Sequence, residues 1–326
     1  MEQSARLNYI DQIKEIAIYF VIVGHIIIFC LPNFPFSRLL LDSISTFNMP
    51  LFAFISGLLF KHNTPPSLKI ILRHIQRLIF PFISVSILFT IYKGHTLERL
   101  IWDNFKHGYW FLLSLFCVYL LAYLILFINK KINTNNIFIS EIMPICGLYI
   151  IFWIGTKTIP STYLNLFSIS LTMSLIPGFF CGYIINKHKL FEKIFTKPLI
   201  FNISSIIFPT FILTNYCYHY SNLPLDIIIS FIAIYCFVYI IYMQRNIHNN
   251  VKNLLEKFGR NSLGIYVCHY FFINFSNLRD IYIPKEYIII QLILILILSI
   301  IIIFSANFTC RIIEKNQYLS LILLGK

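Results

Sequence analysis

The chain has 326 residues, of which 58% are hydrophobic and 12% are charged, and its formal net charge is +13. Soluble domains carry about a quarter charged residues and less than half apolar ones, so this composition excludes an ordinary soluble protein. The positive charge does not indicate nucleic-acid binding here, because the basic residues of membrane proteins collect in cytoplasmic loops.

Ten apolar segments follow one another, each bounded by polar, charged or proline-containing residues. Their length of roughly twenty residues is the length that crosses a hydrocarbon core of ~30 Å as a helix. We therefore predict an all-α, polytopic integral membrane protein with about ten transmembrane helices. The predicted spans are 8–30, 44–61, 74–93, 109–129, 137–155, 168–186, 198–216, 224–243, 262–278 and 286–309. We expect residues 1–326 to form one transmembrane domain with no fused extracytoplasmic domain.

The distribution of lysine and arginine predicts the orientation in the membrane. With the N-terminus in the cytoplasm, 19 of the 26 basic residues fall on the cytoplasmic side and 7 on the other. The positive-inside rule favours this orientation, and an even number of spans places the C-terminus in the cytoplasm as well. The longest outer loop, 94–108, carries apolar residues at helical spacing, which suits a short interfacial helix. This helix could be a simple connector or a substrate lid.

The first span carries ionisable side chains, which are costly inside a membrane and therefore point to function. Lys14 and His25 are eleven residues apart, so they share one helical face and lie about 16 Å apart along the axis. Asp11 can pair with Lys14 one turn away. A neutral imidazole accepts a proton near physiological pH, so His25 is a candidate general base. The alternative is a packing histidine that hydrogen-bonds a neighbouring helix.

A second basic group precedes the third span and includes Arg73, His74 and Arg77. Arginine makes bidentate contacts with phosphate, so this group could hold a phosphate-rich donor. An ordinary positive-inside anchor is the alternative. His269 in the ninth span is either a second catalytic histidine or a structural one. The eight cysteines include no CxxC pair and the histidines share no helical face, so we predict no metal site.

Five segments, in this order along the chain, resemble the motifs of the acyltransferase-3 family. They are Asp11 to Ala17 with Gly24-His25, Met49 to Phe52 with Ser56-Gly57, Arg77 to Pro81, Tyr109 to Leu112, and Ser262 to Tyr266 with His269. Lys14 stands where many members have Arg, but Lys is frequent at this position in the branch that resembles fucose 4-O-acetylases. His74 stands where Arg or Lys is usual, and Asn48 where His is frequent.

The resemblance implies a membrane O-acetyltransferase of the bacterial cytoplasmic membrane, with acetyl-CoA as cytoplasmic donor. The acceptor would be a sugar hydroxyl of a surface polysaccharide, such as O-antigen, capsule or exopolysaccharide, or of its lipid-linked precursor. Polysaccharide-biosynthesis proteins are the expected protein partners. A transporter or flippase of a polysaccharide intermediate, without chemistry, is the alternative, and a membrane scaffold is a third reading.

The expected roles of single residues follow from this resemblance together with their chemistry. We expect catalysis from His25, Lys14 and His269. We expect the donor to be held by Arg73, His74, Arg77 and Lys14. We expect the sugar to be held by Asp11, Asn48, Trp110 and His107.

Overall fold

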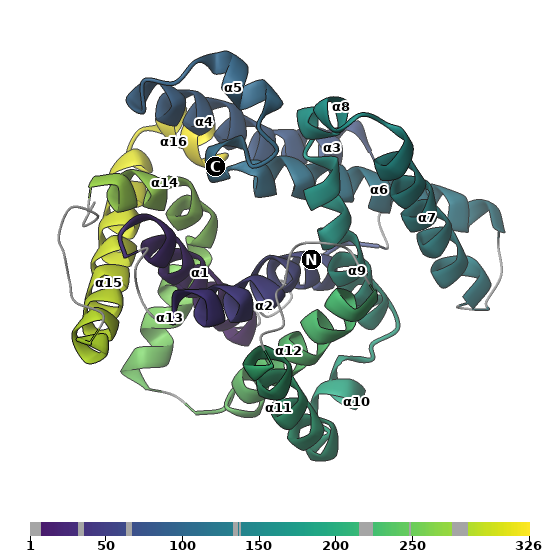
Figure 1. Cartoon of the computed structure of the whole chain (residues 1–326). Coiled ribbons are helices and arrows are strands. Elements are labelled where there is room, and N and C mark those ends of the chain that lie inside the picture. Colours follow the sequence, from purple (N-terminus) through teal and green to yellow (C-terminus); the bar gives the residue numbers. More distant parts are fainter. Residues whose placement is uncertain are drawn as a thin grey trace. The chain divides into compact units, whose positions relative to one another are not determined.

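The computed structural model describes residues 8–31, 36–62, 67–132, 136, 138–214, 224–247, 249–275 and 286–326. Within these ranges every regular element is a helix (Figure 1). Eight helical segments are long and apolar enough to cross a membrane: α1 (Asn8–Phe29), α2 (Ser37–Leu58), α3–η1–α4 (Leu68–Tyr92), α6 (Trp110–Ile132), η3–α7 (Phe138–Thr158), α9 (Ile169–Lys187), α12 (Pro224–Met243) and α15 (Ile288–Ile313). Two shorter apolar helices are α11 (Pro198–Leu213) and α14 (Ser262–Phe275).

These ten segments coincide with the ten predicted spans, so the prediction of a polytopic all-α membrane protein is confirmed. The predicted ends at 216 and 278 lie outside the described residues. The clearest difference is at α2, which begins at Ser37 rather than at residue 44. Its first turns contain Leu39, Leu40 and Leu41, and the hydroxyls of Ser43 and Thr46 bond within the helix, to the carbonyls of Leu39 and Asp42 at 2.7 Å each.

The remaining helices are short, and they are α5 (Leu97–Trp102), η2 (Lys106–Gly108), α8 (Ser161–Leu166), α10 (Phe191–Phe195), α13 (Asn250–Arg260) and α16 (Gln317–Leu324). The helix predicted in the loop 94–108 is present, but it ends at Trp102. It ends there because Asp103 adopts an extended backbone conformation, with φ −75° and ψ 124°.

The chain divides into two compact units, which we describe separately. Unit 1 comprises Met1–Phe52, Phe191–His219 and Pro224–Ile313, and unit 2 comprises Ala53–Leu190, Tyr220–Leu223 and Glu314–Lys326. In unit 1, α1 packs against α12, α13, α14 and α15, and α14 lies beside α15 (Figure 1). Gly259 lets α13 approach α1 closely, since a Cβ there would lie 1.9 Å from the carbonyl oxygen of Asp11.

In unit 2, α9 packs against α6, α7 and α8, and α16 packs against α4 and η1. The last turns of α2 cross α9 at two glycines. A Cβ on Gly57 would lie 1.9 Å from the carbonyl oxygen of Phe179, and one on Gly182 would lie 2.1 Å from that of Phe54. Small residues are what membrane helices use to bring their backbones together, because lipid tails provide no hydrophobic force between helices.

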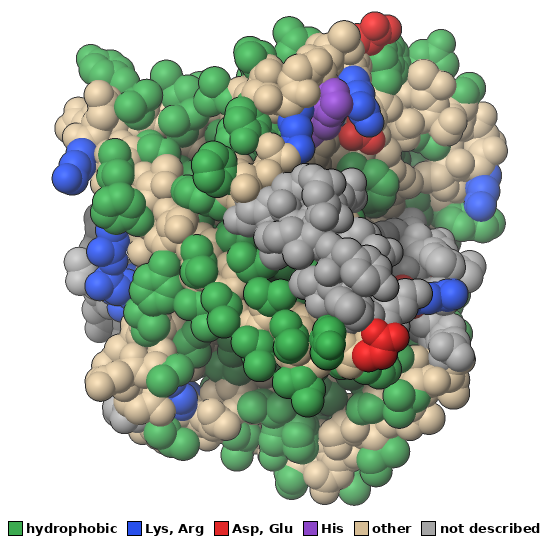
Figure 2. All heavy atoms as spheres, turned by 60° about the vertical axis from the view of Figure 1, so that its left-hand side comes forward, with side chains coloured by type: hydrophobic (Ala, Val, Ile, Leu, Met, Phe, Trp, Pro, Cys, Tyr) green, Lys and Arg blue, Asp and Glu red, His purple; other side chains and the backbone are tan. Residues whose placement is uncertain are grey.

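The surface of α15 is apolar over most of its length. Figure 2 views the side on which α15 lies in Figure 1, and hydrophobic side chains cover much of that face. The exposed large side chains of this helix are Ile289, Ile290, Leu292, Ile293, Leu296, Ile297, Ile300, Ile301, Phe304, Phe308 and Ile312. An apolar surface of this extent is unfavourable in water and suits a helix that faces lipid.

Candidate functional site

Two of the predicted histidines lie together in unit 1. The rings of His25 on α1 and His269 on α14 are stacked, with centroids 5.4 Å apart and an interplanar angle of 28°. The hydroxyl of Tyr270 lies 2.8 Å from Nε2 of His25 and so completes a cluster of three side chains. Our sequence analysis did not single out Tyr270, whose place directly after His269 was the only signal for it.

The hydrogen bonds of His269 fix where its proton sits. Its Nδ1 lies 2.6 Å from the carbonyl oxygen of Tyr266. A carbonyl only accepts, so Nδ1 carries the hydrogen, and in a neutral ring Nε2 keeps its lone pair. This Nε2 is buried, as is Nδ1 of His25, and neither atom has a hydrogen-bond partner within the described part of the chain. The cluster therefore offers two unpartnered ring nitrogens, which suits proton transfer.

The first turns of α1 hold the ion pair that the sequence predicted. The Asp11 carboxylate is 2% exposed and lies 3.4 Å from Nζ of Lys14. Arg260 at the end of α13 is a second partner, with its Nε at 3.9 Å, and spacing along the chain could not reveal it. Asp11 is about 21 Å along α1 from His25, at 1.5 Å per residue. Its predicted contact with the sugar stays a prediction.

Asn48 ties α2 to α1. Its side chain is 5% exposed. In the orientation that satisfies both ends of the amide, Nδ2 donates to the carbonyl of Ala17 at 2.9 Å and Oδ1 accepts from the backbone N–H of Val21 at 3.2 Å. These bonds brace the turn of α1 that precedes His25. A contact between Asn48 and sugar stays a prediction.

Three of the four predicted donor-binding residues lie in unit 2, at the junction of α3 (Leu68–His74) and the π-helix η1 (Ile75–Ile79), whereas Lys14 lies on α1 in unit 1. Arg73 and Arg77 are exposed, so their guanidinium groups are available to a phosphate. His74 is half-buried, stacks on Tyr119 with ring centroids 4.1 Å apart, and has its Nε2 2.8 Å from the hydroxyl of Tyr123. Neither tyrosine was singled out by sequence.

The π-helical turn places Arg77 in an unusual backbone. The N–H of Phe80 bonds to the carbonyl of Ile75, five residues back, and Pro81 has no N–H to offer the carbonyl of Arg77. Gly325 after α16 packs directly on this turn, since a Cβ on it would lie 2.6 Å from Cα of Arg77. Such single π-turns are frequent at functional sites.

The loop 94–108, which the sequence predicts to lie outside, follows α4 (Phe80–Tyr92), whereas Arg73 and Arg77 precede this helix. The helix is about 20 Å long. His107 stacks on His95 with ring centroids 5.2 Å apart, and its buried Nε2 has no hydrogen-bond partner in the described ranges. Lys106, His107 and Gly108 all have positive φ, of 50°, 54° and 98°. Non-glycine residues in this region are strained, and such strain clusters at functional sites. Trp110, at the start of α6, is 5% exposed.

Burial also perturbs the titration of this loop. Lys106 is 2% exposed and its Nζ donates to the carbonyl of Ile101. Burial lowers the pKa of Lys106 to about 8, although the nearby Asp103 acts in the opposite direction. Burial likewise lowers the pKa of His107. His107 is therefore neutral at physiological pH and can accept a hydrogen bond through one ring nitrogen.

The predicted site residues thus fall into two sets. Unit 1 holds Asp11, Lys14, His25, Asn48 and His269, and unit 2 holds Arg73, His74, Arg77, His107 and Trp110. Among the described residues, no three His, Cys, Asp or Glu side chains gather so that they could hold a metal ion.

Comparison with known proteins bears on these two sets. A family model described as an acyltransferase domain matches residues 7–308, which include every predicted site residue. No curated protein and no solved structure matches the chain. The family match covers nearly the whole chain, and its apolar helices are those of a multi-pass membrane protein. The chain therefore belongs to the acyltransferase-3 family and is a membrane acyltransferase.

Proposed function

We propose that this acyltransferase moves an acetyl group from cytoplasmic acetyl-CoA to a sugar hydroxyl of a surface polysaccharide or its lipid-linked precursor. It works in the bacterial cytoplasmic membrane, with both termini in the cytoplasm, beside the proteins that build the polysaccharide. The observation that carries the proposal is the cluster of His25, His269 and Tyr270, which provides unpartnered ring nitrogens within a membrane helix bundle.

The reaction assigned to this cluster is a direct acyl transfer. Nδ1 of His25 takes the proton of the sugar hydroxyl while the N–H at Nε2 stays hydrogen-bonded to the oxygen of Tyr270, which leaves His25 as an imidazolium. The sugar oxygen then bonds to the thioester carbonyl carbon, and the carbon–sulfur bond breaks. The proton passes from the imidazolium to the departing thiolate, so the products are the ester and free CoA. His269, with its lone pair on Nε2, serves as a second acid–base group.

The donor and the acceptor use different parts of the chain. In unit 2, Arg73 and Arg77 hold the donor phosphates, supported by His74, because exposed guanidinium groups match phosphate geometry. In unit 1, Lys14 is the proposed donor contact. In unit 2 the sugar contacts Trp110 and His107, a flat aromatic ring and a neutral imidazole. In unit 1, Asp11 and Asn48 are the proposed sugar contacts. Lys14 in particular fits the branch resembling fucose 4-O-acetylases.

The test is the acetyl-ester content of surface glycans purified from the host. We compare a gene deletion with strains complemented by wild type, by His25→Ala and by Tyr19→Phe, a control change on the same helix. We expect esters to be lost in the deletion, restored by wild type and Tyr19→Phe, and absent with His25→Ala at matched protein levels. Full acetylation by His25→Ala would contradict the mechanism.

The same strains separate the proposal from its alternative. If ester content is unchanged in every strain while export of the glycan stops in the deletion, the chain moves a polysaccharide intermediate without catalysis. That result would contradict the acetyl-transfer proposal.

A further inference from the structure

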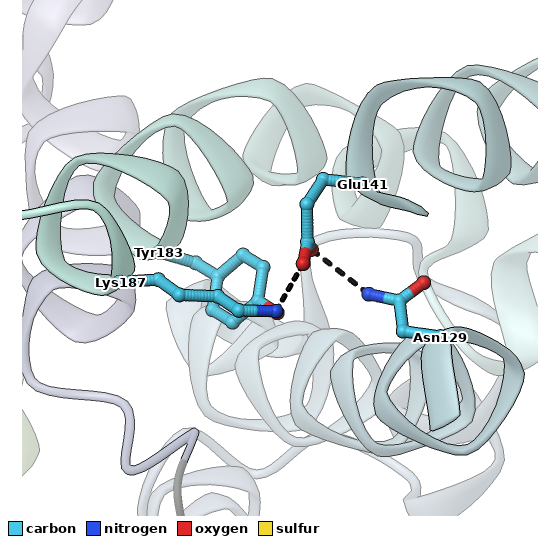
Figure 3. Close-up of polar contacts among 4 residues, drawn as sticks. All are labelled: Asn129, Glu141, Tyr183 and Lys187. Carbon is cyan, nitrogen blue, oxygen red and sulfur yellow. Dashed lines mark hydrogen bonds and ion pairs between the residues drawn. The ribbon is translucent and has the colours of Figure 1, made fainter. Parts of the chain in front are cut away.

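Unit 2 contains a second group of buried polar side chains, which we call the Glu141 cluster: Asn129 on α6, Glu141 on η3 (Phe138–Ile142), and Tyr183 and Lys187 on α9 (Figure 3). Glu141 is 1% exposed, and its two oxygens are engaged by Lys187 Nζ and, at 2.9 Å, by Nδ2 of Asn129. Lys187 also donates to the hydroxyl of Tyr183 at 3.2 Å. None of the roles proposed above uses these residues.

Two histidines border the Glu141 cluster. His188 follows Lys187 directly, and the ring of His62 lies edge-on to Tyr183 with centroids 6.4 Å apart. Burial lowers the pKa of His62, and the charges of Lys187, Glu141 and His188 also act on it. The ring contact with Tyr183 places His62 at the edge of the Glu141 cluster.

Three buried atoms of this region have no hydrogen-bond partner among the residues that the structure describes. They are Nδ1 of His62, Nε2 of His188 and Oδ1 of Asn129. Buried polar atoms are nearly always satisfied, so several open ones in one place call for a bound group. A purely structural ion pair that ties α6, η3 and α9 together would account for Glu141 and Lys187, but it leaves these three atoms unexplained.

The Glu141 cluster is joined to the predicted donor site by a continuous layer of aromatic rings. The ring of Tyr183 lies 5.8 Å from that of Phe60, which lies 5.3 Å from the ring of Tyr123. The hydroxyl of Tyr123 in turn contacts His74, the neighbour of Arg73. Contacting rings therefore connect the Glu141 cluster to the donor site predicted at Arg73 and Arg77.

The open atoms favour one kind of ligand group. The positive charge of Lys187 is matched by Glu141, so the cluster has no surplus charge to attract an anion. Oδ1 of Asn129 only accepts, and a phosphate oxygen beside it would face a second acceptor. A planar heterocycle with an amino group and a ring nitrogen would instead donate to Oδ1 of Asn129 and hydrogen-bond the two imidazoles.

We propose that the Glu141 cluster, with His62 and His188, binds the nucleobase of the acyl donor. This inference rests on the proposed function, in which the donor is acetyl-CoA and the base is adenine. The exocyclic amino group of the base donates one hydrogen to Oδ1 of Asn129 and the other to Nδ1 of His62, and a ring nitrogen accepts from the N–H at Nε2 of His188. Glu141 does not touch the base; it positions Asn129 and Lys187.

The experiment measures binding to the full chain in lipid nanodiscs. The ligands are CoA, 4′-phosphopantetheine, which lacks the nucleotide, and deaminated CoA, whose base carries a carbonyl in place of the amino group. The variants are Asn129→Ala and His62→Ala, with Lys61→Ala as control because Lys61 is exposed and adjacent to His62. His62 is half-buried and outside the membrane spans, so His62→Ala is the variant that will fold if Asn129→Ala does not.

We expect wild type and Lys61→Ala to bind CoA more tightly than either analogue. Asn129→Ala and His62→Ala each weaken CoA binding by about fivefold to tenfold, the effect of one lost hydrogen bond. Both variants keep the wild-type affinity for 4′-phosphopantetheine. Asn129→Ala in addition abolishes the preference for CoA over deaminated CoA. This loss of discrimination is what a merely structural role of Asn129 would not produce.

The outcomes separate this inference from the proposed function. If the variants weaken CoA and 4′-phosphopantetheine equally, or change neither, the base lies elsewhere and the inference is overturned while the donor assignment stands. If wild type binds neither compound, the acetyl-CoA donor itself is wrong, and the base site falls with it.

Discussion

Among single residues, Tyr270 determines how His25 can act. Its hydroxyl lies 2.8 Å from Nε2 of His25, and Nδ1 of the same ring has no partner in the described part of the chain. When Nε2 donates to the tyrosine oxygen, Nδ1 keeps a lone pair and can accept the proton of a hydroxyl. In this arrangement Tyr270 holds the ring of His25 in place and leaves Nδ1 open for a general base.

Tyr270→Phe tests this role, because it removes the hydroxyl and keeps the ring, whose centroid is 4.6 Å from that of His25. We expect kcat to fall by about tenfold to a hundredfold, since proton transfer loses its preferred tautomer, while KM for acetyl-CoA stays near its wild-type value. The measurement is steady-state acetyl transfer by reconstituted protein. An unchanged kcat would remove Tyr270 from the mechanism.

Lys106 predicts a dependence of stability on pH. Burial lowers its pKa from 10.5 to about 8, so between these values the unfolded chain binds more protons than the folded one. The free energy of unfolding therefore rises with pH across this window, by the order of a few kcal/mol for the whole shift. Below about pH 8 the cost of the buried charge is fully present.

Thermal unfolding of wild type and Lys106→Met in detergent, followed from pH 7.5 to 10.5, measures this contribution. Methionine keeps the length of the side chain and does not titrate, so the difference between the two proteins isolates Lys106. We expect Lys106→Met to be the more stable protein near neutral pH, and the difference to shrink as the pH rises. A constant difference would show that Lys106 does not titrate in this range.

His25, His269 and the pair of Asp11 with Lys14 could be predicted from the sequence, because ionisable groups are rare in apolar spans and because helical spacing is regular. Tyr270 and Arg260 could not be predicted from the sequence. Tyrosine is frequent in this chain, with 20 copies, so one more in a span carries no signal. Arg260 reaches Asp11 only through the packing of α13 on α1, which no local pattern encodes.

Among the helical elements of unit 2, α16 packs against the π-helix η1. The π-turn at Ile75–Ile79 carries Arg77, and Gly325, with φ of +65°, lies against its backbone. A side chain at Gly325 would meet both Gln76 and Arg77 at 2.6 Å. Close packing of α16 therefore fixes the turn from which one predicted donor-binding arginine projects.

Gly325→Ala should disturb that arginine without touching the histidine cluster of unit 1. We expect KM for acetyl-CoA to rise by about tenfold, the effect of about 1.4 kcal/mol, with a small change in kcat. Gly147→Ala is the matched control, because a Cβ at this position in α7 (Met143–Thr158) meets nothing within 4 Å. If Gly325→Ala and Gly147→Ala have equal KM values for acetyl-CoA, the packing of α16 does not contribute to donor binding.

Helix positions were predictable because each span is a long apolar run whose ends are marked by polar residues. The π-turn and the glycine contacts were not. In the sequence, the segment from Arg77 to Pro81 looks like an ordinary helix start. The close contacts at Gly57, Gly182 and Gly325 depend on an opposing backbone that the sequence does not reveal. Periodicity reports which residues are apolar, but it does not report which two backbones will touch.

Across the whole molecule, acetyl transfer requires that the basic residues of α3 and η1 face the compartment that holds acetyl-CoA. Within unit 2, Arg73 and His107 lie toward opposite ends of α4, as expected if the donor and the acceptor approach from opposite sides. The charge distribution predicts which end is cytoplasmic, since 19 of 26 basic residues fall on that side. This orientation can be measured directly.

The measurement uses a chain whose cysteines are replaced and which carries one new cysteine, at Glu98 in α5 or at Lys61 after α2; both positions are exposed. A thiol reagent that does not cross membranes should label Glu98→Cys in intact spheroplasts and Lys61→Cys only after permeabilisation. The reverse pattern would place Arg73 and Arg77 outside, away from cytoplasmic acetyl-CoA. Donor binding by these arginines would then be untenable, even if His25 remained essential.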